Sequence, residues 1–216
     1  MGSSDKQIVS RGKPKGDIYY DNVASNYEVR RQKQAWWHVE HKEMKSLLST
    51  LPDGLSVVDV PFGTGRFVKL YREKNFDISG LDASGHMIST AKDILGDDFT
   101  GIDARIGSAM NLPFADEQFD LVVSTRFLSD IIVYRDAKKV ISEFSRVTKK
   151  YAIIQLGQNR GEGFIPGEDS PMGGLMSETD VAEMLEGFNL RILDARLVLE
   201  KDADSADMYH FLCEKV

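Results

Sequence analysis

The amino-acid sequence predicts an α/β fold built on a doubly wound, mostly parallel sheet. Three observations support this prediction. Between residues 55 and 156, short apolar runs alternate with longer stretches in which apolar residues recur at helical spacing. A glycine-rich turn follows the first apolar run, and the last two runs of the chain are joined by a short turn-like segment. Alternating strands and helices favour parallel pairing, whereas two strands that share a short turn form an antiparallel hairpin.

The N-terminal part is predicted to lie outside the sheet. Residues 1–16 are polar and contain several glycines, which indicates a flexible N-terminal segment. A single domain is expected over residues 17–216. Its first part, residues 17–50, carries apolar and aromatic residues at helical spacing and is predicted to form a helical cap of two helices. The cap ends before the turn signal at residues 51–54.

The central part supplies the parallel strands and the helices that connect them. Ser84 precedes one helix and is a suitable N-cap, because its hydroxyl can accept a hydrogen bond from the first turn. Helices are expected on both faces of the sheet, in a Rossmann-like arrangement. The predicted strands are residues 55–60, 76–81, 101–106, 119–124 and 151–156, and the predicted helices are residues 65–74, 84–95 and 136–147.

The C-terminal part completes a sheet of seven strands. Residues 157–176 form a long loop with several glycines, and loops of this length in a compact domain are usually functional, so we expect a substrate loop here. A short helix over residues 178–186 follows. Residues 191–199 and 207–214 are the strands of the predicted C-terminal antiparallel hairpin.

Composition narrows the classes of partner. The formal net charge of -7 disfavours nucleic acid, because an acidic surface repels phosphate groups. Cys213 is the single cysteine, so an internal disulfide and a thiolate metal cluster are excluded and a cytoplasmic location is expected. The chain has no apolar run near the ~20 residues of a membrane span. We therefore expect a small-molecule partner, and a monomer or homodimer.

The glycine-rich turn is the first chemical signal. A buried-strand pattern ending at Asp59 leads into Gly63 and Gly65, and a helix follows. Glycines let the backbone turn tightly and approach a ligand closely, and a helix N-terminus offers unpaired N–H groups. The combination suits a nucleotide cofactor, although a tight turn without any ligand would look the same.

An acidic residue at the end of the next strand is the second signal. Asp82 follows Gly65 by 17 residues, close to the spacing at which a carboxylate binds both ribose hydroxyls of an adenosine. One ionised carboxylate can accept a hydrogen bond from each hydroxyl. Capping of the following helix by Asp82 is the alternative interpretation, but Ser84 can supply that cap.

The turn also discriminates between nucleotides. A dinucleotide fingerprint needs a third glycine, and Val68 occupies that position. Asp59 would repel a pyrophosphate but could accept from an ammonium group. The sequence also lacks the Gly-Lys-Ser/Thr of a Walker A loop. An adenosine that carries an amino acid fits these residues better than NAD, and a nicotinamide-dependent oxidoreductase on a related fold stays as the alternative.

Four segments in order resemble the motifs of class I S-adenosylmethionine-dependent methyltransferases, and in particular the ubiquinone/menaquinone-methyltransferase-like group. The segments are residues 59–67, 81–92, 107–114 and 119–124. The resemblance implies S-adenosyl-L-methionine as cofactor and transfer of a methyl group to O or N of a small-molecule acceptor by in-line displacement. A tRNA or protein acceptor remains an alternative.

The resemblance also implies a set of cofactor-binding residues. Glycines of the turn would line the methionine part, Asp82 would hold the ribose, and residues 108–110 would border the adenine together with Ala83 and Met87. In the cap, Tyr27 and one of Arg30 or Arg31 would reach the cofactor carboxylate. The complete set is Tyr27, Arg31, Asp59, Phe62, Gly63, Thr64, Gly65, Asp82, Ala83, Met87, Ser108, Ala109, Met110 and Ser124.

The sequence departs from the family pattern at three places. Pro61 stands where the first glycine of the turn is usual, which fixes φ and removes a donor. Ser108 stands where an acidic residue often receives the adenine amine. After the fourth strand, Ser129 and Asp130 replace a pair of histidines.

Candidate catalytic residues lie on the acceptor side. A sulfonium is a strong electrophile, so the enzyme mainly positions the acceptor, and it needs a general base only for a protonated acceptor. His38 is the candidate base, with His41 as the alternative; their spacing does not predict a metal site. Arg126 and Asp130 are expected at the mouth of the site, where Arg126 would bind an acidic group of the substrate. Of the adjacent Trp36 and Trp37, one is expected to line the pocket and the other to be core.

Overall fold

The computed structural model describes residues 33–160, 163, 165, 167–169, 176–200 and 206–216. These residues exclude the predicted N-terminal segment, the first part of the helical cap with Tyr27, Arg30 and Arg31, and about half of the predicted loop 157–176. The side chain of Asp130 is also outside the description. The predictions for these parts stay as predictions.

A mixed sheet of seven strands has the order β3-β2-β1-β4-β5-β7-β6, which confirms the predicted fold class. Strands β3, β2, β1, β4 and β5 pair in parallel, whereas β7 is antiparallel to both β5 and β6. The strands are β1 (Ser56–Asp59), β2 (Asp77–Asp82), β3 (Asp103–Ile106), β4 (Phe119–Ser124), β5 (Thr148–Gln158), β6 (Leu190–Leu199) and β7 (Asp207–Lys215).

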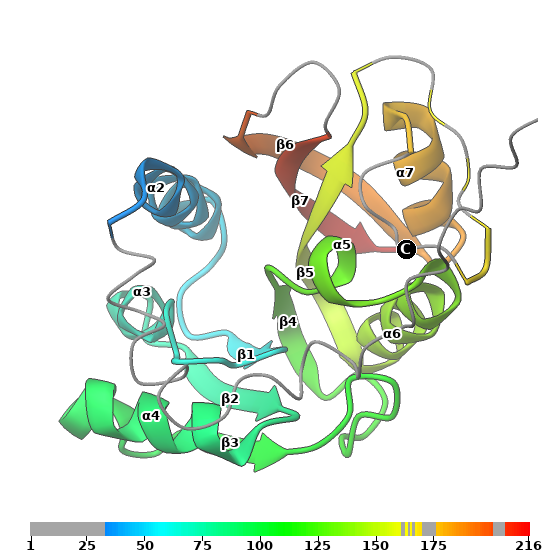
Figure 1. Ribbon diagram of the computed structural model, residues 1–216. Coiled ribbons are helices and arrows are strands. Elements are labelled where there is room, and N and C mark those ends of the chain that lie inside the picture. Colours follow the sequence, from blue (N-terminus) through cyan, green and yellow to red (C-terminus); the bar gives the residue numbers. More distant parts are fainter. Residues whose placement is uncertain (1–32, 161–162, 164, 166, 170–175, 201–205) are drawn as a thin grey trace, which may run out of the picture.

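Helices cover both faces of the sheet, and Figure 1 shows α2, α3 and α4 on one side and α6 and α7 on the other. The described helices are α2 (Ala35–Ser49), α3 (Val68–Glu73), α4 (Gly85–Leu95), the 3₁₀ turn η2 (Gly96–Phe99), α5 (Leu128–Ile131), α6 (Tyr134–Val147) and α7 (Glu178–Glu186). The helix and strand patterns of the sequence therefore correspond to real elements; α5 and η2 were not predicted.

Alternation of side chains along the strands produces the two core layers. Val58 and Val122 pack with the apolar faces of α6 and α7, while their chain neighbours Val57 and Val123 pack with α2 and α3. Successive strand residues point to opposite faces, so strands covered on both faces need continuous apolar runs. This is why consecutive apolar residues occur at positions 57–58 of β1 and 121–123 of β4.

The carboxyl ends of the parallel strands lie at the same edge of the sheet. At this edge β1 lies between β2 and β4. The register pairs Asp59 on β1 with Gly80 on β2 and with Val123 on β4. The connection from β1 leads to β2 on one side, and β4 lies on the other side, so the chain reverses its direction of winding here. In open α/β sheets such a switch point carries the ligand crevice.

Candidate functional site

A pocket lies at this switch point. Its walls come from the turn after β1, the ends of β2, β3 and β4, and helix α2. Eight of the predicted cofactor residues line it, together with the predicted Arg126: Asp59, Phe62, Gly63, Thr64, Asp82, Ala83, Met87 and Ala109. Trp36 and Trp37 also line the pocket, so both adjacent tryptophans face it rather than one of the two.

The other predicted site residues that the structure describes do not line the pocket. Gly65 lies inside the turn, and Ser124 is buried at the end of β4, where its hydroxyl has no hydrogen-bond partner among the described residues. The Oγ of Ser108 accepts from the N–H of Met110 at 3.2 Å, and Met110 is exposed. His38 is exposed on α2 with its ring 5.1 Å from the ring of Trp37.

Backbone hydrogen bonds hold the turn after β1, one to β2 and one within the turn. The N–H of Phe62 donates to the carbonyl of Leu81 at 2.8 Å, and the N–H of Gly65 donates to the carbonyl of Phe62 at 3.0 Å. Gly65 has φ of 70°, and a Cβ on it would lie 2.6 Å from Cδ1 of Leu95. The positive φ therefore favours glycine at this position, and an added Cβ would also displace the end of the Leu95 side chain. Pro61 precedes the turn after a cis peptide bond, in the place of the usual first glycine.

The Asp82 carboxylate is held against the turn. Its Oδ2 accepts from the N–H of Gly63 and its Oδ1 from the N–H of Ser84, both at 2.8 Å. Burial raises the pKa of Asp82, and the two N–H groups oppose that rise. The Oγ of Ser84 accepts from the N–H of Met87 at 3.4 Å, which confirms Ser84 as the N-cap of α4. Because a carboxylate has about four lone-pair positions, Asp82 retains acceptor capacity toward the pocket.

Asp59 is the second carboxyl group of the pocket. It is buried at the end of β1, and the hydroxyl of Tyr71 donates to its Oδ2 at 2.9 Å. Burial raises the pKa of Asp59 to about 8; the Tyr71 hydroxyl opposes the rise, and the charge of Asp82 adds to it. An ammonium group in the pocket would favour the ionised carboxylate.

Helix α2 forms the opposite wall together with two arginines. The guanidinium of Arg126 lies over the ring of Trp36 with its Cζ 3.8 Å from the centroid, and that of Arg66 lies over Trp37 at 4.6 Å. Arg126 follows β4 with φ of 55°, and its N–H donates to Oε1 of Gln155 at 2.7 Å. This wall is aromatic and cationic, whereas the opposite wall carries the carboxylates.

Comparison with known proteins agrees with this geometry. The sequence profile of a family described as a methyltransferase domain matches residues 58–155. That match spans the strands and turns that build the pocket. The chain contains a class I S-adenosylmethionine-dependent methyltransferase domain. The donor that this family uses is S-adenosyl-L-methionine.

Relatives and solved structures differ in how much they share with this methyltransferase domain. A demethylmenaquinone methyltransferase of Renibacterium salmoninarum is 32% identical over 136 residues, which cover 60% of this chain and 52% of that protein. The chain thus spans about half the length of the demethylmenaquinone methyltransferases that it matches.

Solved structures share the fold, and two of them carry different activities. Magnesium protoporphyrin IX methyltransferase from Synechocystis, solved with bound S-adenosylmethionine, has a TM-score of 0.61 at 15% identity, covering 92% of this chain and 88% of that chain. The [4+2]-cyclase SpnF has a TM-score of 0.65 at 19% identity, covering 80% of each chain. One fold therefore accompanies different chemistries, and the reaction has to be argued from the site.

The residues of the methyltransferase domain fit its cofactor. Gly63 borders the pocket with φ of 56°, so its backbone can approach a ligand without a side chain in the way. Asp82 would hold the ribose, and Asp59 would face the ammonium of the methionine part. Leu81, Met87 and Ala109 supply apolar surface for the adenine.

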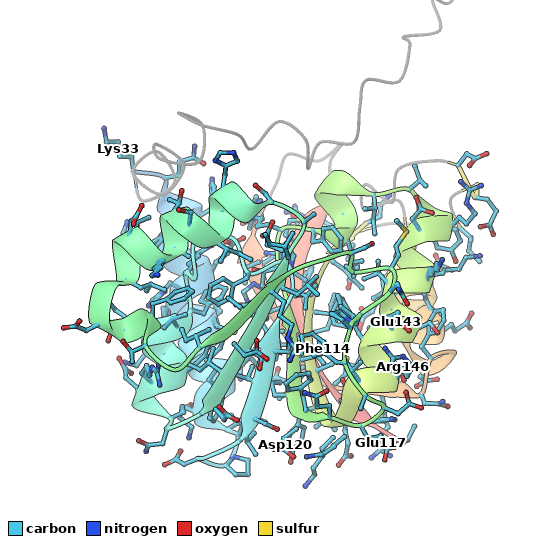
Figure 2. All side chains as sticks on the ribbon, turned by 90° about the horizontal axis from the view of Figure 1, so that it is seen from below. Lys33, Phe114, Glu117, Asp120, Glu143 and Arg146 are labelled. Atoms are coloured by element: carbon cyan, nitrogen blue, oxygen red, sulfur yellow. The ribbon has the colours of Figure 1, made fainter. Side chains whose placement is uncertain are left out.

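Two side chains of helix α6 bind the backbone of the loop after β3. Arg146 donates to the carbonyls of Leu112 and Phe114 at 3.1 and 2.9 Å, and Glu143 accepts from the N–H of Leu112 at 2.7 Å. Figure 2 shows Glu143 and Arg146 beside Phe114. Ala109 borders the pocket just before these residues, so the hydrogen bonds of Glu143 and Arg146 help to shape the pocket wall.

Several pocket residues were not predicted from the sequence. Arg66 and Thr125 line the pocket, and the buried Glu40 binds Arg66. Arg66 could have been found, because it directly follows the glycine turn. Glu40 lies between His38 and His41 in a helical stretch, where its charge predicts an exposed position. Among the described residues, no cluster of His, Cys, Asp and Glu could hold a metal, and no helix could cross a membrane.

Proposed function

We propose that the chain transfers a methyl group from S-adenosyl-L-methionine to an oxygen or nitrogen atom of a small-molecule acceptor by in-line displacement. The supporting observation is that one pocket joins the carboxyl-bearing turn to the wall formed by Trp36, Trp37 and Arg126. A cofactor bound along the strand ends would present its methionine part toward that wall. The acidic net charge of -7 supports a small molecule over a nucleic acid.

The cofactor supplies an electrophilic methyl group on a sulfonium, and the work of the chain is positioning. Asp82 would fix the ribose through its two oxygens, and Asp59 would fix the ammonium. Trp36 and Phe127 would hold the acceptor from the side and exclude water. Positioning of this kind converts a bimolecular step into an effectively unimolecular one.

The acceptor side offers Arg126 as a group for an acidic substituent of the acceptor. A general base is needed only if the accepting atom carries a proton at neutral pH. His38 stays the candidate base, with His41 as the alternative. His38 is exposed on α2 and neither histidine lines the pocket, so either would act only on an acceptor that projects out of the mouth. Asp130 stays a candidate residue of that mouth.

Calorimetry and label transfer together test the proposal. Calorimetric titrations with S-adenosylhomocysteine and with NAD are expected to give binding for the former and none for the latter. Methyl-tritiated cofactor is then incubated with separated metabolite, tRNA and protein fractions from cells, and label is expected in the metabolite fraction. Binding of NAD, or label confined to tRNA or protein, would refute the corresponding part of the proposal.

A further inference from the structure

Glu40 on α2 is a charged side chain with no exposed surface. A buried carboxylate is costly unless it is paired and hydrogen-bonded. Its Oε2 accepts from Nη1 of Arg66 at 2.6 Å. Its Oε1 lies 2.7 Å from Nε of Arg126 and accepts from Nε2 of Gln155, also at 2.7 Å. One carboxylate of the cap helix thus joins the turn after β1, the end of β4 and strand β5.

Both arginines are held against the two tryptophans of the same helix. Nη2 of Arg66 donates to the carbonyl of Trp37 at 2.6 Å, and its Cζ lies 4.6 Å from the centre of the Trp37 ring. Arg126 lies over Trp36 at 3.8 Å. Glu40 is three residues after Trp37 and four after Trp36, so all three side chains can share one side of α2. The two arginines and two tryptophans all line the pocket.

A neutral layer lies behind the carboxylate. Gln155 donates to Glu40 and, through its Oε1, accepts from the backbone N–H of Arg126, which has a positive φ. Nε2 of the buried His210 lies 3.3 Å from Nε2 of Gln155. Burial, with the charges of Arg66 and Arg126, lowers the pKa of His210 to about 3, so this imidazole is neutral. Glu40 is therefore the buried anion on which both arginines converge.

We propose that Glu40 is a positioning residue, which holds Arg66 and Arg126 against Trp37 and Trp36 and thereby sets the pocket wall beside the cofactor and the methyl acceptor. Its part in methyl transfer rests on the proposed function. A residue that only anchored α2 to the sheet would affect stability and leave the affinity and the tryptophan environment of the folded protein unchanged.

Tryptophan fluorescence reports directly on this arrangement, because Trp36 and Trp37 are the two tryptophans of the chain. The test compares the wild type with Glu40→Gln, which keeps the shape and removes the charge, and with Glu43→Gln on the same helix. Glu43 pairs with Lys42 at 3.5 Å, and its side chain is 17% exposed, whereas that of Glu40 has no exposed surface. Each protein is measured for emission, acrylamide quenching, melting temperature and calorimetric affinity for S-adenosylhomocysteine.

The expected result is a shifted emission and about tenfold weaker S-adenosylhomocysteine binding in Glu40→Gln, with neither change in Glu43→Gln, since one misplaced charged group in a pocket costs about 1.4 kcal/mol or more. Wild-type affinity and emission in a folded Glu40→Gln protein of lower melting temperature would overturn the proposal. If that variant does not fold, Glu40→Gln with Arg126→Gln removes one charge of each sign, and wild-type values there overturn it equally.

The fluorescence arm separates this proposal from the proposed function. A wild-type protein that binds neither S-adenosylhomocysteine nor S-adenosylmethionine refutes the proposed function, and the emission of Glu40→Gln still decides whether Glu40 positions the arginines.

Discussion

Binding of the cofactor is expected to release a proton from Asp59. Its carboxyl group has a pKa of about 8 in the free protein because it is buried, so roughly nine-tenths of the molecules carry it neutral at pH 7. The ammonium of a bound cofactor would stabilise the ionised form, because opposite charges within a few ångströms favour it. The site therefore has to lose a proton before that pair can form.

The pKa sets the size of the effect. Between pH 6 and pH 7 the ionised fraction of a group with a pKa of about 8 rises about tenfold, and the affinity for S-adenosylhomocysteine should rise by about the same factor. At pH 7 the release should be roughly 0.9 protons per ligand bound. Calorimetry at pH 7 in two buffers with different ionisation enthalpies measures that number directly.

Asp59→Asn is the matched control, since it keeps the shape and removes the titration. Burial also raises the pKa of Asp82, so a residual slope of the same sign is expected in the variant. The effect of Asp59 is the slope of log affinity against pH for the wild type minus the slope for Asp59→Asn. Equal slopes, or an affinity of the wild type that falls from pH 6 to pH 7, would refute the assignment of Asp59 to the ammonium.

Titration of Asp59 should also change the stability of the folded protein. An acid whose pKa is raised in the folded state contributes stability that is present below its unfolded pKa, near 3.8, and lost as the pH rises to about 8. The wild type without cofactor should therefore lose stability relative to Asp59→Asn from pH 5 to pH 8, by at most about 1.4 kcal/mol per pH unit. Melting temperatures across that range check it, and a constant difference contradicts it.

Three further substitutions test the cofactor site and the parts of the fold that support it. Asp82→Ala should weaken S-adenosylhomocysteine binding by roughly 1.5–3 kcal/mol by calorimetry, because the ribose hydroxyls lose their acceptor; unchanged affinity removes that role. Gly65→Ala should destabilise the fold by about 1–3 kcal/mol more than Gly101→Ala, which has φ of 79° but nothing within 4 Å of an added Cβ. Equal denaturation midpoints would show that the contact with Leu95 is irrelevant. Arg146→Ala should lower stability by about 2 kcal/mol, or about 4–8 °C in melting temperature, whereas the exposed Arg191→Ala should stay within about 0.5 kcal/mol.

The fold was predictable because each central strand is covered on both faces. That geometry favours consecutive apolar residues, such as residues 121–123 within β4. The helix predicted over residues 178–186 coincides with α7. Helix α5 has four residues, too few to show a helical period. The sequence also indicated the final hairpin without indicating that β7 would lie between β5 and β6, because neighbours across a sheet leave little trace in a single sequence.

The two walls of the pocket also differ in how far the sequence predicts them. Gly63 and Asp82 occupy turns in which backbone geometry and residue type are tied together over a few positions, so a local motif identifies them. Glu40 is 115 residues from Gln155, and no local pattern distinguishes a helix glutamate that meets a distant glutamine from one that faces water. Contacts of that kind require the three-dimensional fold.

Under the proposed function, the position of α2 separates the choice of acceptor from the rest of the fold. The cofactor wall comes from strand ends whose register is fixed by the sheet, so it cannot change without disturbing the core. In the proposed function the acceptor wall comes from α2. This helix meets the sheet through Leu47 and Leu48 on its apolar side and through the bond of Glu40 to Gln155 of β5 on its pocket side. A helix attached in this way can change Trp36 and Trp37 while the strands keep their packing. The choice of acceptor should therefore reside in α2 and the arginines that it holds, and exchange of Trp36 and Trp37 should alter acceptor preference while the strands keep their packing.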